Sequence, residues 1–231
     1  MPEYRDEQTP APWNGVRFRD RAEAGRRLAA ELGAYADRPD VLVLALPRGG
    51  VPVAAEIARA LDAPLDLMLV RKLGVPGHEE LALGAVATGG VRVLNEDVVG
   101  ALGLDEELID EVARRELAEL ERRQRAYRGE RPTPTLEGRR LILVDDGLAT
   151  GATMRAAVEA ARDLGPTEIV VAVPVAPPDT CRLLEEVADD VVCVESPEPF
   201  LAIGVWYERF PQVGDEEVRA LLDAVPAPRS G

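Results

Sequence analysis

One stretch of thirteen residues, 141–153, constrains the fold of this chain more than any other part of the sequence. It begins with four apolar residues, a run of the length and composition of a buried strand. Two carboxylates, Asp145 and Asp146, come where that strand should end. The alanine-rich segment 154–162 then has the composition of a helix. The stretch therefore predicts a strand, a loop and a helix, which is the repeating unit of an α/β sheet.

The loop between this strand and helix has the features of an anion site. Free backbone N–H groups and the positive end of the helix dipole meet at the start of a helix and favour a bound phosphate. Thr150 and Thr153 add hydroxyl donors, and Gly151 lets the backbone approach the anion closely. The loop lacks the lysine of a Walker motif and the glycine spacing of a dinucleotide fingerprint. Adjacent carboxylates before a phosphate loop instead suit a sugar phosphate, because they can accept hydrogen bonds from vicinal ribose hydroxyls.

Residues 141–153 read Leu-Ile-Leu-Val-Asp-Asp-Gly-Leu-Ala-Thr-Gly-Ala-Thr and resemble the motif with which type I phosphoribosyltransferases bind 5-phosphoribosyl 1-diphosphate. The resemblance implies a transferase of nucleotide metabolism that moves ribose 5-phosphate to a nitrogenous acceptor, such as a nucleobase, and releases pyrophosphate. It implies that Asp145 and Asp146 are the catalytic acids and meet Mg²⁺ indirectly, through ribose hydroxyls or water. The residues that it implies for the 5-phosphate group are Gly147, Ala149, Thr150, Gly151, Ala152 and Thr153.

A second strand, loop and helix unit comes earlier in the chain. Residues 41–46 are a continuous apolar run, typical of a central parallel strand, and residues 51–61 have the pattern of a helix. The Pro-Arg-Gly-Gly turn between them offers two glycines and one arginine to an anion, although a tight strand-to-helix turn also needs glycines. Ligands of α/β sheets bind at the carboxyl ends of the strands, so both loops are expected at one site.

In the family that the chain resembles, the loop after the first core strand binds pyrophosphate, commonly through a non-proline cis peptide. The bond between Arg48 and Gly49 stands where that peptide is expected. A third apolar run, 65–70, ends in two basic residues, which are either pyrophosphate ligands or a solvated strand end. The pyrophosphate-binding residues that the resemblance implies are Arg48, Gly49, Gly50, Arg71 and Lys72.

A polar segment, 73–82, follows these basic residues and carries two glycines, a proline and the chain's single histidine, His78. The resemblance implies that this segment is a mobile loop that closes over the active site and excludes water. His78 is left open as either a surface residue or a catalytic one. Two short strands are expected at 84–87 and 90–94.

A long helix is predicted from about 105 to 127, with Asp105 as its N-cap. Its apolar residues form one narrow stripe, and the rest of its surface is densely charged. That surface is either a solvated face with ion pairs between successive turns or a contact between subunits, which would make the protein a homodimer.

Four of the nine aromatic residues of the chain gather in the segment 197–210. In the family, such a segment forms the hood, a small cap that holds the acceptor, although each of these residues alone is equally explained as core. An apolar slot for a flat ring is expected from Phe200, Ile203, Trp206 and Tyr207. Members that act on 6-oxopurines carry an aspartate where this chain has Ala149, so that route of proton transfer is not expected here.

The composition excludes several classes of protein. A net charge of −15, from 42 acidic against 27 basic residues, argues against nucleic-acid binding, which needs an excess of Lys and Arg. No apolar run is long enough to cross a membrane, and the start of the chain lacks the apolar core of a signal peptide. The two cysteines do not have the spacing of a zinc site. We therefore expect a cytoplasmic protein that binds small molecules.

The repeated alternation of strands and helices predicts a doubly wound α/β fold with a mainly parallel sheet and a small C-terminal hood. The expected organisation is an N-terminal tail at 1–16, an α/β core at 17–195, and a hood segment with a C-terminal helix at 196–231. The expected function is that of a phosphoribosyltransferase. The alternatives are a non-catalytic nucleotide- or phosphoribosyl-binding regulatory module on the same fold, and a hydrolase or phosphorylase of a related sugar phosphate.

Overall fold

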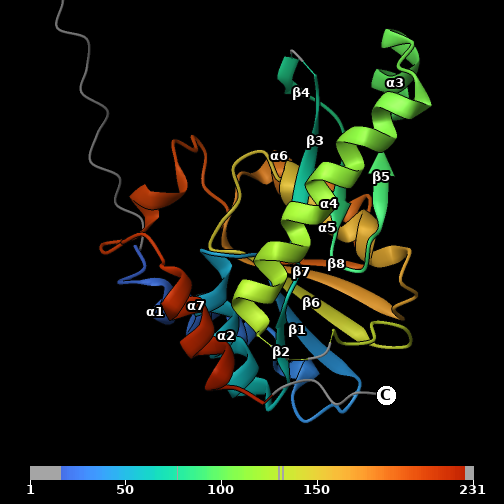
Figure 1. Cartoon of the computed structure of the whole chain (residues 1–231). Coiled ribbons are helices and arrows are strands. Elements are labelled where there is room, and N and C mark those ends of the chain that lie inside the picture. Colours follow the sequence, from blue (N-terminus) through green and yellow to red (C-terminus); the bar gives the residue numbers. More distant parts are fainter. Residues whose placement is uncertain (1–16, 77, 130, 132, 227–231) are drawn as a thin grey trace, which may run out of the picture.

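The computed structural model describes residues 17–76, 78–129, 131 and 133–226, and the N-terminal tail predicted at 1–16 lies outside them. A parallel sheet of five strands forms the centre, in the order β2-β1-β6-β7-β8 (Figure 1). Its strands are β1 (Val41–Ala45), β2 (Leu65–Leu67), β6 (Arg140–Val144), β7 (Glu168–Val175) and β8 (Asp190–Glu195). The three middle strands are apolar and almost fully buried, as expected where helices cover both faces.

Helices cover the two faces of this sheet, which confirms the predicted doubly wound fold. One face carries α1 (Arg21–Glu31), α2 (Gly50–Leu61) and α7 (Asp215–Asp223). The other face carries α5 (Ala152–Arg162) and α6 (Pro178–Glu185). Successive residues of β1 alternate between the two apolar clusters, because side chains of a strand point to opposite faces.

An antiparallel sheet stands beside the central one and forms an arm with two helices. Its strands are β3 (Val70–Val75), β4 (His78–Ala87) and β5 (Arg92–Leu94), and the helices are α3 (Glu96–Leu102) and α4 (Glu106–Arg128). Two expectations for this region were wrong. The apolar run 65–70 is not one strand, because the chain leaves the central sheet after β2 and Leu69 N then donates to Thr88 Oγ1 at 2.9 Å. The segment 73–82 is not an irregular loop, since most of it pairs as β3 and β4.

The long helix α4 begins after its predicted N-cap, Asp105, whose side chain accepts from Glu107 N. Its buried side includes Ile109, Val112 and Leu120, which pack into the same apolar cluster as β3 and β4. The apolar stripe is therefore used within the chain. Ion pairs between successive turns, such as Arg123 with Glu119, occupy the exposed side.

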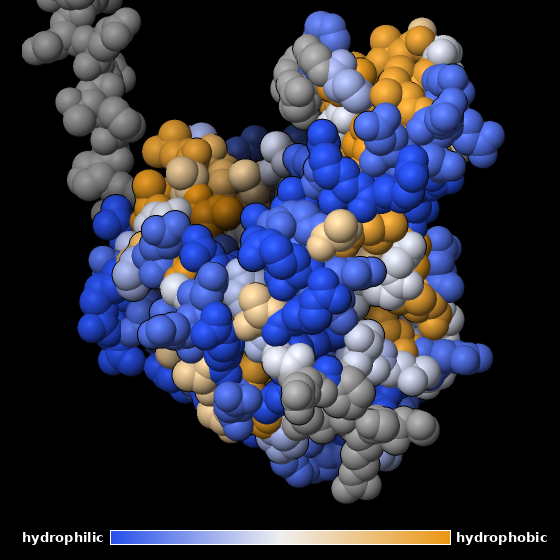
Figure 2. Space-filling model, viewed as in Figure 1, coloured by the Kyte–Doolittle hydropathy of each residue, from blue (hydrophilic) through white to orange (hydrophobic). Residues whose placement is uncertain are grey.

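The hood contains the short helix η2 (Ile203–Trp206) and is tied to the start of the chain. Phe18 N donates to Trp206 O at 2.8 Å, and Glu208 N donates to Phe18 O at 2.8 Å. α7, by contrast, packs on α2 and α4 and belongs to the core. The hood and the arm rise from the same edge of the sheet, and the surface is hollowed between them (Figure 2). Among the described residues, no helix has the length and apolar character to cross a membrane.

Candidate functional site

Two loops at the carboxyl ends of neighbouring strands form the centre of the site. β1 and β6 pair in parallel, so the turn at 47–50 and the loop at 145–151 leave the sheet side by side. Leu46 N donates to Val144 O at 2.8 Å across them. The turn contains a cis peptide between Pro47 and Arg48, one bond before the predicted position. The structure thus brings together the two loops that the sequence assigned to one ligand.

Gly49 lies directly against one of the predicted catalytic acids. A Cβ atom on Gly49 would stand 2.1 Å from Asp146 Oδ2, and one on Gly50 would stand 2.5 Å from Val144 O. Cβ atoms in proteins do not approach non-bonded atoms so closely. Glycine is therefore needed at both positions, because the turn packs against the Asp146 carboxylate at Gly49 and against the backbone at the end of β6 at Gly50.

Replacing Gly49 by Ala is expected to displace the Asp146 carboxylate and to weaken binding of a sugar phosphate donor. The packing conflict should also lower the free energy of unfolding by about 1–3 kcal/mol, the usual cost of an inserted methyl group. Calorimetric titration with 5-phosphoribosyl 1-diphosphate and a denaturant titration would measure the two effects. Gly33→Ala is the matched control, because nothing lies within 4 Å of a Cβ there. Unchanged donor affinity in Gly49→Ala would show that the turn is not part of the donor site.

The two acids are less exposed than their place at a strand end suggested. Asp146 is 8% exposed, and Asp146 N donates to Asp145 Oδ1 at 2.8 Å. Burial and the neighbouring charge of Asp146 raise the pKa of Asp145 well above its usual range. Burial also raises the pKa of Asp146, although the ion pair with Arg21 opposes this. A bound cation would therefore stabilise the ionised form of both carboxyl groups.

The loop that follows the acids is held in place by its neighbours and opens toward solvent. A Cβ atom on Gly147 would lie 2.7 Å from Ile203 Cγ2. A Cβ atom on Gly151, whose φ is 70°, would lie 2.8 Å from Thr180 Cγ2. Thr180 Oγ1 donates to Ala149 O at 2.7 Å. The remaining phosphate-binding candidates, Thr150, Ala152 and Thr153, are exposed at the start of α5. The N-cap of α5 is Gly151, which has no side chain to compete with an anion for the first N–H groups.

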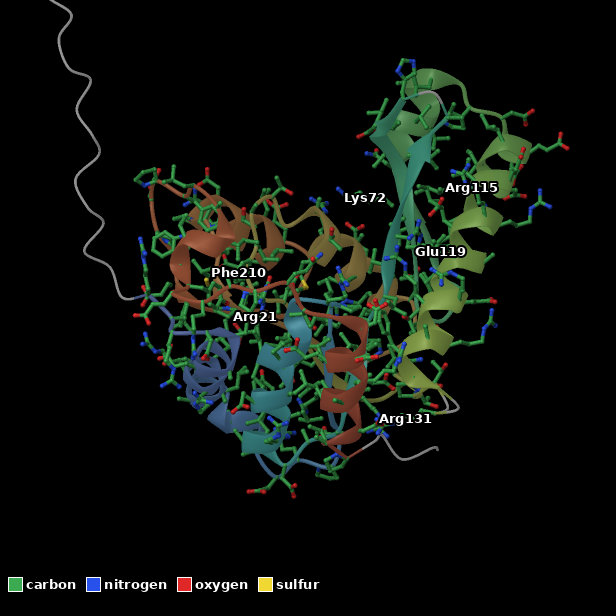
Figure 3. All side chains as sticks on the ribbon, turned by 60° about the vertical axis from the view of Figure 1, so that its left-hand side comes forward. Arg21, Lys72, Arg115, Glu119, Arg131 and Phe210 are labelled. Carbon is green, nitrogen blue, oxygen red and sulfur yellow. The ribbon has the colours of Figure 1, made fainter. Side chains whose placement is uncertain are left out.

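The five predicted pyrophosphate residues do not all converge. Arg48 lies at the site, with its Nη1 only 3.4 Å from Asp215 Oδ1. Arg71 and Lys72 are successive residues of β3 and so point to opposite faces. Arg71 faces α4, where its Nε donates to Glu116 Oε2 at 2.6 Å, while Lys72 points away from α4 (Figure 3). The geometry therefore disfavours Arg71 as a ligand and retains Lys72.

Lys72 lines a cavity of about 540 Å³ between the antiparallel sheet and α5. Ala152 and Arg155, from the first turns of α5, line the same cavity. Lys72 and the start of the phosphate loop thus border one space. His78 is exposed at the start of β4 and does not line this cavity.

A second cavity, of about 440 Å³, lies beneath the hood, and only one of the four predicted acceptor residues lines it. Trp206 is 3% exposed and stacks on Phe200, with ring centroids 6.2 Å apart, and Tyr207 is 4% exposed. These three rings belong to the apolar cluster in which the hood packs against Phe18, α1 and β7. Tyr207 still reaches the site, because its hydroxyl donates to Asp146 O at 2.6 Å. The cavity is lined by Arg21, Arg48, Gly49, Asp146, Ile203, Phe210, Pro211, Gln212 and Val213.

Arg21 is the main site residue that the sequence analysis missed. It belongs to the first turn of α1, yet its Nε lies 2.7 Å from Asp146 Oδ2. A signal was present, since position 21 shares one face of a helix with Gly25, Leu28 and Leu32, which are small or apolar residues of the kind that a helix buries. A charged residue on a buried stripe needs a partner, and that requirement marks Arg21 as unusual.

Comparison with known proteins agrees with this geometry. A family model described as a phosphoribosyl transferase domain matches residues 18–205, which include both loops and the first part of the hood. The chain belongs to this family.

Relatives of this phosphoribosyl transferase domain are found among curated proteins and solved structures. Proteins from two strains of Mycobacterium tuberculosis, each named “Putative phosphoribosyl transferase”, are 50% identical over 206 residues, which is 89% of this chain. That alignment covers 46% of each relative, so the chain spans about half the length of the curated relatives it matches. The crystal structure of TT1426 from Thermus thermophilus is 44% identical, with a TM-score of 0.81 over 90% of this chain and 98% of that one.

The phosphoribosyl transferase domain has few protein ligands for the Mg²⁺ that its family resemblance implies. Within the described residues, no group of three or more His, Cys, Asp and Glu side chains could hold a metal ion. The two adjacent carboxyl groups do supply the oxygen chemistry that Mg²⁺ prefers. Mg²⁺ commonly keeps several waters and binds substrate phosphates, so these residues fit an ion that binds together with a phosphate-bearing ligand.

Proposed function

We propose that this protein is a phosphoribosyltransferase that uses 5-phosphoribosyl 1-diphosphate. It would transfer ribose 5-phosphate to a nitrogenous acceptor, with the nucleobases as the first class to screen, and release pyrophosphate. The observation that carries the proposal is the contact between Gly49 and the Asp146 carboxylate, which joins the anion-binding turn to the acids beside the phosphate loop. One donor molecule would contact the turn, the two acids and the phosphate loop at the same time.

In this proposal, each part of the donor has its own partners. The N–H groups at the start of α5, with Thr150 and Thr153, bind the 5-phosphate. Asp145 and Asp146 accept hydrogen bonds from the ribose hydroxyls. Arg48 and the glycines of its turn, with Lys72 from the arm, bind the diphosphate.

The chemical step is loss of the diphosphate from ribose, which leaves positive charge on the sugar. The carboxylates of Asp145 and Asp146 would lie beside that charge and stabilise it, because fixed negative groups in a poorly hydrated site cost little reorganisation. Arg48 and Lys72 would stabilise the negative charge on the departing pyrophosphate. Bound Mg²⁺, held near Asp145 and Asp146 through ribose hydroxyls or water, would supply further neutralisation of the diphosphate.

The acceptor would enter the cavity beneath the hood, on the side of Ile203 and Phe210. Ile203 is the one predicted acceptor residue that lines this cavity, and the partly exposed ring of Phe210 adds an aromatic surface. In this proposal, Phe200, Trp206 and Tyr207 hold the hood in place and Ile203 and Phe210 contact the acceptor. A homodimer and a cytoplasmic location remain parts of the proposal.

The decisive test is a screen of free nucleobases with the donor and Mg²⁺, with pyrophosphate release as the readout. Turnover with one base would support the enzyme and name its acceptor. Donor binding without turnover of any base would favour the alternative, a regulatory module that binds nucleotides or phosphoribosyl groups. Failure to bind the donor would overturn both assignments.

Lys72→Gln is expected to weaken donor binding, whereas Arg71→Gln should leave it nearly unchanged. Losing a charged hydrogen-bond partner of the diphosphate should cost about 1.5–3 kcal/mol, which is roughly a tenfold to hundredfold loss of affinity. Arg71 is the matched control because it is adjacent in sequence and basic but contacts Glu116 on the other face. Calorimetric titration with the donor and Mg²⁺ gives the comparison. Equal losses in both variants would contradict the assignment of the two faces.

A further inference from the structure

Arg21 connects three separate parts of the molecule through its guanidinium group. Nε lies 2.7 Å from Asp146 Oδ2, and Nη1 donates to Pro211 O in the hood at 2.7 Å. The flat face of the guanidinium stacks on Phe210, with Cζ 3.8 Å from the ring centroid. Figure 3 shows Arg21 and Phe210 together between the core and the hood. The planar shape of arginine allows all three contacts at once, which a lysine could not make.

The neighbours of Asp146 leave its side chain little freedom. Arg21 holds Oδ2 on one side, and the backbone of Gly49 closes the other, since even a methyl group would not fit between them. Tyr207 fixes the backbone of the same residue by donating to Asp146 O at 2.6 Å. Of these three contacts, the ion pair is the one made by a side chain to the carboxylate itself. It also comes from a helix 125 residues away in the sequence.

We propose that Arg21 is a positioning residue for donor binding, which acts by holding the Asp146 carboxylate in the orientation that the ribose hydroxyls require. This inference rests on the proposed function, because it concerns how one of the two donor-binding acids is oriented. Arg21 does not itself bind the ribose. Its hydrogen bond to Pro211 and its stacking on Phe210 fix the guanidinium from the hood side, so the position of the hood also bears on Asp146.

The test measures affinity for two ligands in single variants of Arg21. Ribose 5-phosphate is a probe that carries the ribose hydroxyls and the 5-phosphate without a diphosphate, and the complete donor with Mg²⁺ is the second ligand. Arg21→Lys and Arg21→Gln should each lower affinity for both ligands by about 10- to 100-fold, the range seen when a group that orients a ligating side chain is removed. Arg26→Gln is the control, since Arg26 lies on the same helix and pairs with Glu56 at the surface. It should bind both ligands normally.

A double-mutant cycle separates a positioning role from a direct one. Asp146→Asn and Arg21→Gln are measured singly and together. If Arg21 acts through Asp146, adding Arg21→Gln to Asp146→Asn should change donor affinity by less than about threefold, because nothing is left to orient. The same loss in both backgrounds would mean that Arg21 contacts the donor or only supports the fold, and it would overturn the proposal.

Folding controls keep the test decisive. Arg21→Lys keeps the positive charge, and the double variant removes both charges, so neither leaves a lone buried charge. Wild-type affinity in a folded Arg21→Lys and Arg21→Gln would overturn the inference alone. A wild-type protein that binds neither ligand would overturn the proposed function and this inference with it. If every Arg21 variant fails to fold, including those with balanced charge, the residue is structural and the inference is wrong.

Discussion

Replacing Asp145 and Asp146 together by Asn is expected to abolish binding of 5-phosphoribosyl 1-diphosphate. Both carboxylates are assigned to the ribose hydroxyls, and each lost charged hydrogen bond should cost about 1.5–3 kcal/mol. Two such losses correspond to a fall in affinity of roughly 100-fold to more than 10,000-fold. Calorimetric titration of the double variant with the donor and Mg²⁺ measures this directly. Wild-type affinity in that variant would contradict the assignment of the donor site.

The structure changes what this double variant should do to stability. Carboxylates at an exposed strand end could be replaced at little cost to stability, but Asp146 is buried and paired with Arg21. Removing its charge leaves a buried guanidinium without its partner, which destabilises proteins by about 3–5 kcal/mol. Asp145→Asn alone keeps that ion pair and removes the nearby like charge, so it is the cleaner variant. Asp179→Asn, an exposed acid on α6, serves as the control for both measurements.

Arg128→Met is expected to destabilise the fold as strongly as loss of the Asp146 charge, at a buried ion pair outside the two loops of the site. Arg128 and Asp66 are 5% and 3% exposed, and Arg128 Nε lies 2.6 Å from Asp66 Oδ1. Arg128 Nη2 also donates to Leu67 O at 3.0 Å, which joins α4 to the edge strand β2. Breaking such a buried pair costs about 3–5 kcal/mol, and for a chain of this size the midpoint of thermal unfolding should fall by roughly 6–20 °C.

Two further variants identify the cause of that loss. Arg122→Met changes the same residue type on the same helix, but Arg122 pairs with Glu119 at the surface, where ion pairs contribute about 0–1 kcal/mol. Adding Asp66→Asn to Arg128→Met removes the stranded charge and should restore much of the lost stability. If Arg122→Met proved as costly as Arg128→Met, general damage to α4 would be the better explanation.

The parts of the fold that the sequence predicted well are those decided by neighbours in the chain. The apolar run 141–144, the loop and the helix to residue 162 appear as β6 and α5, because burial and helix formation there depend on local composition. Asp105 caps α4 for the same reason. The prediction of one strand over 65–70 was wrong because the division of this run between two sheets depends on a contact with Thr88, 19 residues from Leu69.

The candidate site was predictable to the extent that its residues lie in local motifs. The acids, the phosphate loop and the turn at 47–50 each have a recognisable pattern, and the parallel pairing of β1 and β6 brings them together. The sequence could not predict that Arg71 faces α4. Its pattern places Arg71 at the end of a core strand, whereas Arg71 lies within β3. Which aromatic residues line the cavity also depends on tertiary packing, which buries Trp206 and leaves Phe210 partly exposed.

Residue 226 lies at the amino end of the edge strand β2, which is a suitable position for attaching the protein to a surface. Leu65 N donates to Pro226 O at 3.2 Å, so residue 226 lies beside the first residue of β2. The proposed donor site lies at the opposite ends of the parallel strands. A linker joined beyond Pro226 could therefore fix the protein to a biosensor surface with the hollow between hood and arm facing the solution.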